Sequence, residues 1–299
     1  MFNIIGKHKN TSLHLMVVIL GLTGVLGKLI TLDATHLVWY RMLIAFIALF
    51  LFLVYKKQLL TISKKDFFGI LGVGAIVTIH WLCFFKSIKV STVSVAVVCL
   101  ATSSLFSALI EPIFFKKKLM LYEVVMGVVV FAALVYVLGA EIQYLHGYLY
   151  GILAAFLGTL FTLFNAKYIN KVDAVQITMI EMLAGIIIIS SIFLFNQDFS
   201  IFNTPISATD FMCLIILGIL CTAMVFVWMT EIMRHITPFS LIMAINLEPI
   251  YSIVLALIIF GESELMSTSF YIGSIIIIAV VYLESYIKKT NNRLPWKSF

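Results

Sequence analysis

Charged residues are scarce in this sequence, and their scarcity excludes a water-soluble protein. Asp, Glu, Lys and Arg make up 11% of the 299 residues, whereas hydrophobic residues make up 63%. Soluble domains have about 25% charged residues. A soluble fold of this length has too little interior for so much apolar side chain, and the mean hydropathy of +1.13 agrees. We therefore expect an integral membrane protein.

The sequence also lacks the motifs of several enzyme classes. It has no G-x-x-x-x-G-K-[ST] phosphate loop, no H-E-x-x-H zinc motif and no G-x-S-x-G serine motif. Its four Cys all lie inside apolar runs without C-x-x-C spacing, which is typical of small buried side chains. We expect no catalysis, no metal site and no cofactor.

What the sequence does contain is a series of about ten apolar runs. Each is long enough to cross the roughly 30 Å hydrocarbon core of a bilayer as a helix. The expected spans are residues 11–31, 36–55, 66–86, 91–115, 121–139, 146–167, 174–195, 210–233, 238–260 and 267–287. We predict an all-α integral membrane protein with ten transmembrane helices and short loops, the longest being a polar external loop at 196–209.

The basic residues are distributed unevenly between the two sides of this arrangement. Sixteen of the 20 Lys and Arg fall on the side of the termini, and four (Lys28, Arg41, Lys86 and Lys89) fall on the other. Cytoplasmic loops carry the excess of basic residues. Both termini are therefore predicted to be cytoplasmic, in the cell inner (plasma) membrane, with a basic cytoplasmic tail at 288–299. The net charge of +6 is attributed to these flanks, and no nucleic-acid partner is expected.

An internal repeat divides the chain into two halves, predicted as 11–139 and 146–287. Residues 90–94 align with 236–240 at an offset of about 146, and Asp33 and Arg41 align with Asp173 and Glu181 at an offset of about 140. Each half holds about five spans. Because five is odd, the second half must enter the membrane from the opposite side. This predicts two inverted five-helix repeats with substrate near the midplane between them.

The ninth span carries the most costly side chain. Glu248 lies near its middle, beside Asn246 and Pro249, and a carboxylate at that depth costs roughly 2.5–3.5 kcal/mol even on insertion scales. Glu248 is predicted to face a cavity, where it would bind a substrate amine or a proton. The alternative is a structural carboxylate satisfied by Asn246 or nearby backbone. Pro249 cannot donate a backbone hydrogen bond and is predicted to kink the helix.

Two further charges are predicted inside the membrane. Arg41 lies about five residues into span two and could hold a substrate carboxylate, or its stem could reach the outer surface. Its repeat mate Glu181 lies about seven residues into span seven. The exchange of charge suggests an ion pair across the repeat, two poles of one site for a zwitterion, or an independently satisfied Glu.

The other candidates are polar or aromatic residues of spans three, four, eight and nine. His80 could carry protons or hydrogen-bond within the bundle, and Trp81 and its approximate repeat counterpart Trp228 could stack on a solute or pack in the core. Small polar residues often serve close helix packing instead. The remaining candidate residues are Lys86, Ser94 and Ser240.

Acidic residues near the span ends are assigned structural roles. Glu111 lies close to Lys116–Lys118 and is predicted to cap a membrane exit. Glu231 is expected to pair with Arg234 at i, i+3. Glu262 and Glu264 are predicted to lie in a solvated external turn before span ten.

Two segments resemble the EamA branch of the drug/metabolite transporter superfamily. They are Phe85-Lys86-Ser87-Ile88-Lys89-Val90-Ser91-Thr92-Val93-Ser94, and Asn246-Leu247-Glu248-Pro249 through Phe260-Gly261-Glu262. In that branch each half carries an aromatic-Ala-Leu-Lys-like turn and a small-residue helix ending in Leu-Gly-Glu. Lys86 departs from this pattern, as does Lys116-Lys117-Lys118 at the end of the first half.

The resemblance extends from Leu13 to about Ile287. It implies a central cavity lined by spans three, four, eight and nine, in a family described as exporting or exchanging amino acids and other metabolites. We therefore expect a secondary active transporter, with export favoured, of a small polar or amphipathic metabolite such as an amino acid. Protons are a further candidate ligand, and both a monomer and a homodimer remain open.

Several alternatives remain open at this stage. A channel-like facilitator or a metabolite exchanger would share the same architecture. A membrane-embedded lipid enzyme would need clustered Asp, His or Cys at one face, and the sequence shows no such cluster. A non-transporting subunit would not need mid-membrane charge in both halves.

Overall fold

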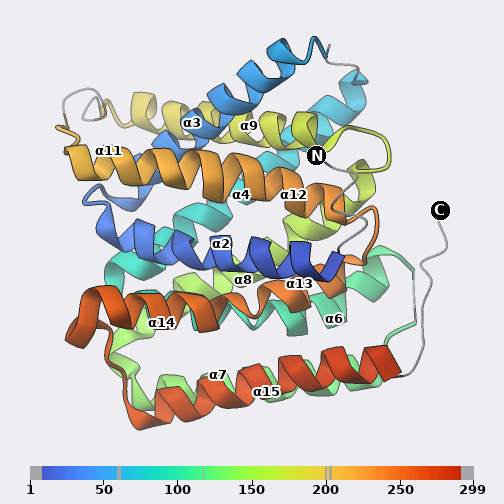
Figure 1. The fold of residues 1–299 in the computed structure, drawn as a ribbon, viewed down its shortest axis with the longest axis vertical. Helices are drawn as coiled ribbons and strands as arrows, with labels where there is room; N and C mark the ends of the chain where they lie inside the picture. The colour runs from blue at the N-terminus through green and yellow to red at the C-terminus, as the bar shows by residue number, and fades with distance from the viewer. Residues whose placement is uncertain (1–8, 59–61, 117, 199–200, 202–203, 291–299) are drawn as a thin grey trace.

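The computed structural model describes residues 9–58, 62–116, 118–198, 201 and 204–290. Within these ranges nine helical segments are long and apolar enough to cross a membrane, and a tenth helix has a shorter apolar stretch at Thr268–Val280. The described chain is helical, as predicted, and its ten helical segments agree with the ten predicted spans (Figure 1). The predicted basic tail at 288–299 lies mostly outside the described residues.

The helices are bounded as follows. The first half contains α2 (Lys9–Leu29), α3 (Ala34–Tyr55), α4 (Lys64–Val90), α5 (Val93–Leu100), α6 (Ser103–Phe114) and α7 (Leu121–Ala140). The second half contains α8 (Leu145–Tyr168), α9 (Ala174–Phe195), α11 (Ala208–Ile215), the π-helix η2 (Ile216–Met224), α12 (Val225–Ile232), α13 (Pro238–Ile245), α14 (Glu248–Phe260) and α15 (Thr268–Thr290). Two short 3₁₀ turns, η1 (Ile142–Tyr144) and η3 (Gly261–Glu264), join helices.

The same N-terminal caps recur in both halves. Asp33 caps α3 as Asp173 caps α9, and Thr92 caps α5 as Thr237 caps α13. Ser63 and Ser207 cap α4 and α11, each accepting a hydrogen bond from the backbone N–H of an Asp three residues later. A capping oxygen satisfies one of the free N–H groups of the first helical turn. These equivalent caps start equivalent helices, so they support the inverted repeat.

Two spans are interrupted at mid-membrane. The fourth span breaks between α5 and α6 at Ala101 and Thr102, and the ninth breaks between α13 and α14 at Asn246 and Leu247. The predicted kink at Pro249 is therefore placed slightly too late. Pro249 lies in the first turn of α14, where its missing N–H costs no hydrogen bond. The break in the fourth span has no proline and was not predicted.

The helix contacts of one half are equivalent to those of the other, with the packing partners exchanged. α2 packs on α14 as α8 packs on α5 and α6, and α3 packs on η2 as α9 packs on α4. The last helices of the halves, α7 and α15, lie side by side at one edge of the bundle (Figure 1). This exchange of partners is expected for inverted halves related by an axis in the membrane plane.

The bundle has two ends, which we name by one residue each. The Lys28 end is where α2 ends and α14 runs into η3, and the Arg234 end is where α12 ends and α13 begins. α2 begins and α15 ends at the Arg234 end (Figure 1).

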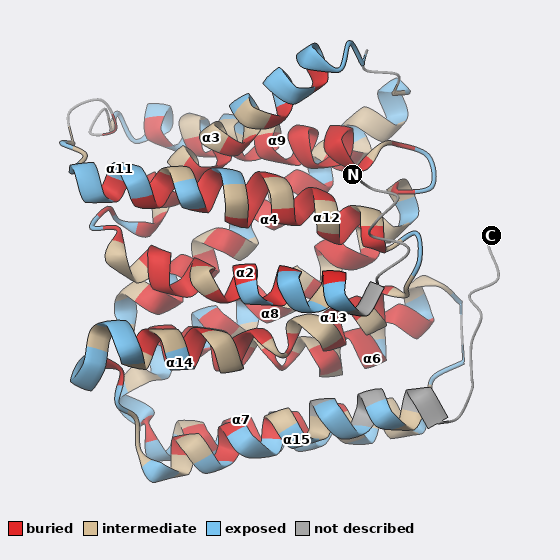
Figure 2. Cartoon of the chain, viewed as in Figure 1, coloured by how far each residue is buried: buried red, intermediate tan, exposed pale blue. Residues whose placement is uncertain are grey.

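The outside of the bundle is apolar. Exposed faces carry large hydrophobic side chains such as Phe195 and Ile113, which are 90% and 80% exposed, while the buried residues face inward (Figure 2). Lipid rather than water suits such a surface.

Candidate functional site

A cavity lies inside the bundle where the two broken helices meet. It holds about 660 Å³ of empty space, its mouth included, and is lined from α2, α3, α4, the facing ends of α5 and α6, α8, α12, α13 and the start of α14. Arg41, His80, Trp81, Asn246 and Glu248 line it. Five of the ten sequence candidates are therefore brought together from four separate helices.

Arg41 is the cation of this cavity and is 1% exposed. Its Nε donates a hydrogen bond of 3.0 Å to Thr222 Oγ1, and its guanidinium lies 3.8 Å from the centre of the Trp81 ring. Its Nη1 has no hydrogen-bond partner among the described residues. An aromatic face stabilises a desolvated cation by about 2 kcal/mol, which offsets only part of the cost of burying the charge. Arg41 does not reach the surface.

Glu248 is the anion of the same cavity and is 4% exposed. It begins α14 directly after the break in the ninth span. The Asn246 amide donates a long hydrogen bond of 3.5 Å to Ala101 O, at the break in the fourth span. Glu248 and Arg41 attract one another electrostatically, but no ion pair within 4.0 Å joins them in the described chain. Opposite charges therefore face one cavity without neutralising each other directly.

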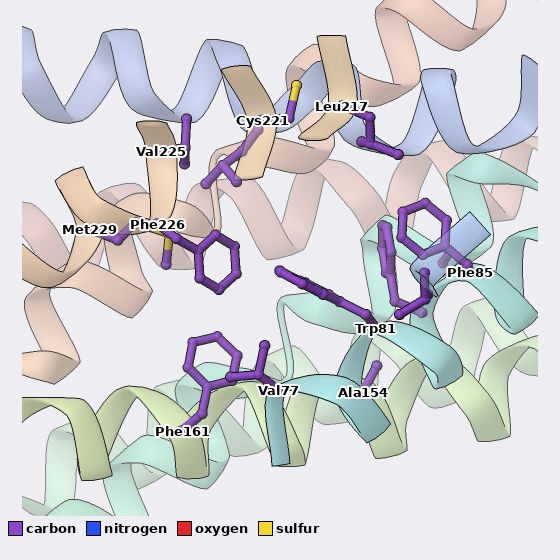
Figure 3. Packing of buried hydrophobic residues seen from close by; sticks show 14 of the residues in the cluster. Val77, Trp81, Phe85, Ala154, Phe161, Leu217, Cys221, Val225, Phe226 and Met229 are labelled. Carbon is purple, nitrogen blue, oxygen red and sulfur yellow. The ribbon is translucent and has the colours of Figure 1, made fainter. Parts of the chain in front are cut away.

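Aromatic rings from α4, α8 and α12 lie close together (Figure 3) and form an apolar part of the same cavity lining. Trp81 meets Phe226 edge-on with ring centres 4.7 Å apart, and Phe226 stacks on Phe161 at 5.9 Å. His80 Nδ1 is hydrogen-bonded to Ala154 O at 2.7 Å. This bond fixes the ring against α8 and leaves its other edge towards the cavity lining.

The other five candidates lie outside the cavity. Lys86 is exposed, because it projects from the side of α4 opposite Trp81 and Phe85. Trp228 is half-buried and does not line the cavity, although its neighbours in α12, Phe226 and Met229, do.

The two serine candidates, Ser240 and Ser94, form hydrogen bonds in the first turns of α13 and α5. Ser240 N donates to Thr237 Oγ1 in the first turn of α13. Ser94 Oγ donates to Glu264 at 2.9 Å.

Glu181 is fully buried but forms no ion pair with Arg41. The Trp39–Ser190 hydrogen bond and the contact of Gly185 with Met42 fix the register of α3 against α9. In this register Arg41 lies opposite residues near 187, six positions from Glu181, or about 9 Å along the helix. The predicted ion pair across the repeat is wrong because the antiparallel mates lie at different depths.

Thr222 is a hydrogen-bond partner of the cavity residue Arg41 that the sequence did not reveal. It lies in the π-helix η2, and its hydroxyl donates to Leu217 O, five residues earlier, at 2.6 Å while accepting from Arg41. π-helical segments are frequent at functional sites. The feature that could have revealed it is a hydroxyl among apolar residues of span eight.

The prediction for Glu264 is wrong, whereas that for Glu262 agrees with its exposure. Glu264 is fully buried at the Lys28 end and binds Lys28 Nζ at 2.7 Å. It also accepts hydrogen bonds from Val93 N at 3.0 Å and Ser94 N at 3.1 Å. A carboxylate at a helix N-terminus satisfies the free N–H groups of the first turn, which sequence spacing could not show because α5 is 170 residues away.

Glu111 has the mirrored role at the Arg234 end. It is buried in the last turn of α6, and its Oε2 accepts a hydrogen bond of 2.9 Å from Phe239 N in the first turn of α13. The predicted membrane-exit cap is therefore a cap on another helix. Glu231 and Arg234 pair at 3.1 Å, as predicted.

Comparison with known proteins gives the same overall picture. A family model described as "EamA-like transporter family" matches residues 11–139 and 145–286. An uncharacterized transporter from Haemophilus influenzae is 34% identical over 94 residues, which are 31% of this chain and 31% of that protein's length. A protein of known crystal structure superimposes with a TM-score of 0.70 over 94% of this chain and 98% of its own, at 14% identity. Likeness at that identity shows the fold alone.

Proposed function

Because this chain belongs to the EamA-like transporter family, we propose that it moves a small zwitterionic metabolite with an apolar side group across the membrane. An apolar amino acid has this chemistry. The site would be the cavity between the two inverted halves, as expected for transporters built from such repeats.

The observation that carries the proposal is the pair of unpaired charges in one cavity. Within the described part of the chain, Arg41 Nη1 has no hydrogen-bond partner, and Glu248 lies in the same lining without an ion pair. A guanidinium binds a carboxylate through parallel hydrogen bonds, and a carboxylate binds an ammonium group. One zwitterion would satisfy both poles and lower the cost of burying them.

The apolar wall indicates the rest of the substrate. Trp81, Phe161 and Phe226 lie beside the charged pair. Burying apolar substrate surface there contributes about 25 cal/mol per Å². A hydrocarbon side group therefore suits the cavity better than a second charge.

Alternating access is supported by the mirrored carboxylate caps. Glu264 ties η3 to the start of α5 at the Lys28 end, and Glu111 ties α6 to the start of α13 at the Arg234 end. Each tie joins one half of the chain to the other. Breaking one while the other holds would open the cavity at one end only, which is what rocking of two repeats requires.

We further propose outward transport across the inner membrane, with both termini cytoplasmic. The excess of basic residues at the Arg234 end supports this orientation. Reporter fusions to the two termini would test it: signals from opposite compartments would contradict the proposed topology. Leucine export from right-side-out vesicles would test the direction.

Counterflow in proteoliposomes tests the substrate. Vesicles preloaded with unlabelled L-leucine should take up labelled L-leucine to a saturable level, whereas a channel-like facilitator would give no counterflow. Leucinamide, which lacks the carboxylate, and 4-methylpentanoate, which lacks the ammonium group, should compete poorly because each leaves one buried charge unmatched.

The variant Glu248→Gln isolates one pole. We expect leucine counterflow to fall at least tenfold while expression is retained, since a charged hydrogen bond is worth about 1.5–3 kcal/mol. 4-Methylpentanoate should compete relatively better in this variant. Glu262→Gln, at an exposed position, is the matched control. Wild-type counterflow in Glu248→Gln would remove Glu248 from substrate binding.

A further inference from the structure

Glu181 forms a second buried polar site, apart from the cavity. Its carboxyl group is fully buried, and neither oxygen has a hydrogen-bond partner among the described residues. The Asn165 side chain of α8 lies beside it, and Asn165 Oδ1 has no hydrogen-bond partner among the described residues either. One turn earlier on the same face of α9, the buried hydroxyl of Thr178 is also unpartnered.

Among the described residues, no Lys, Arg or His side chain pairs with the Glu181 carboxyl group. Four ionisable groups on the helices around Glu181 have other partners. Arg41 of α3 contacts Trp81 and Thr222, His80 of α4 bonds to Ala154 O, Lys167 of α8 lies over the Phe114 ring, and Glu231 of α12 pairs with Arg234. An ionised carboxylate without a partner is strongly disfavoured in such surroundings.

One proton bound to Glu181 would provide a hydrogen-bond partner both for the Glu181 carboxyl group and for Asn165 Oδ1. The neutral acid has an O–H that can donate to Asn165 Oδ1, an acceptor that otherwise has no donor. Resting on the proposed transport function, we propose that Glu181 is a proton-binding site of the transport cycle, separate from the Arg41–Glu248 cavity. The proton comes from water on one side of the membrane and returns to water on the other, so no further reactant is needed.

Close helix packing controls the access of water to this site. Gly74 of α4 lets that helix approach so closely that an added Cβ would lie 2.7 Å from Glu181 Cα. Water cannot pass between helices in such contact. Release of the proton between α4 and α9 therefore requires these two helices to separate, which would couple the proton to the movement of the two halves.

An infrared titration of purified protein tests proton binding without any substrate. Glu181→Gln copies the neutral acid in shape, so it should fold normally and remove a protonated-carboxyl band that wild type retains above about pH 7, where exposed Glu is ionised. Glu262→Gln should leave that band unchanged. Failure of Glu181→Gln to fold, or an unchanged band, would overturn the proposal, because a neutral Glu181 tolerates an amide and contributes such a band.

Transport measurements distinguish the two proposals. Glu181→Gln should keep L-leucine counterflow and lose at least tenfold of the leucine accumulation driven by an imposed pH gradient. Equal pH-driven accumulation in wild type and Glu181→Gln would overturn the proton site while leaving the leucine proposal intact. If wild type fails to move leucine but the band is lost in Glu181→Gln, proton binding stands and the substrate proposal fails.

Discussion

The buried carboxylate of Glu264 should contribute strongly to the stability of the Lys28 end. It accepts three hydrogen bonds from the first turn of α5 at 2.9–3.1 Å and one from Lys28 at 2.7 Å. The variant Glu264→Gln keeps the shape but replaces one acceptor oxygen with an NH₂ group that faces backbone donors.

The expected loss can be worked from these contacts. Hydrogen bonds to a charged group contribute about 1.5–3 kcal/mol each, and a carboxylate at a helix N-terminus contributes about 0.3–1 kcal/mol. The Lys28 side chain is 25% exposed, so solvent screens part of its attraction. Replacing two bonds with weaker neutral ones, and losing the charge, should cost about 3 kcal/mol.

Thermal unfolding in detergent, followed by tryptophan fluorescence, provides the assay. A loss of about 3 kcal/mol lowers the melting temperature by about 5–10 °C. Glu262→Gln changes an exposed residue two positions away in the same turn and should shift stability by less than about 0.5 kcal/mol. Equal melting temperatures for the two variants would refute the view that Glu264 caps α5.

Two further outcomes are expected. Gly74→Ala should lower the melting temperature by about 5 °C, because the new Cβ would lie 2.6 Å from Ala184 Cβ and overpacking costs about 1–3 kcal/mol. Gly72→Ala, in the same helix with nothing within 4 Å, should melt like wild type, and a matching drop in both variants would contradict the close approach of α4 and α9. Thr222→Val should weaken leucine affinity in counterflow about fivefold by releasing Arg41 Nε, since one hydrogen bond is worth about 1 kcal/mol. Ser191→Ala, whose exposed hydroxyl bonds only within its own helix, is its control, and an unchanged affinity in Thr222→Val would remove Thr222 from the positioning of Arg41.

The inverted architecture could be predicted from the sequence because its causes are local or periodic. Apolar runs of about twenty residues leave a chain little alternative to crossing the membrane as helices. The repeat was visible because equivalent helix starts need equivalent caps, as at Asp33 and Asp173. The cost of a mid-membrane carboxylate was also enough to predict that Glu248 avoids lipid.

Only the tertiary structure decided which polar residues meet. Successive side chains along a helix point in directions about 100° apart. Trp81 therefore lines the cavity, whereas Lys86, five residues later on the same helix, faces outward. The sequence predicted Glu264 to lie in a solvated turn, because the groups that donate hydrogen bonds to it lie on α5, 170 residues earlier. Arg41 and Glu181 align as repeat mates, yet inversion places them at different depths and gives each its own surroundings. Pairings between distant helices depend on register and rotation, and a single sequence records neither.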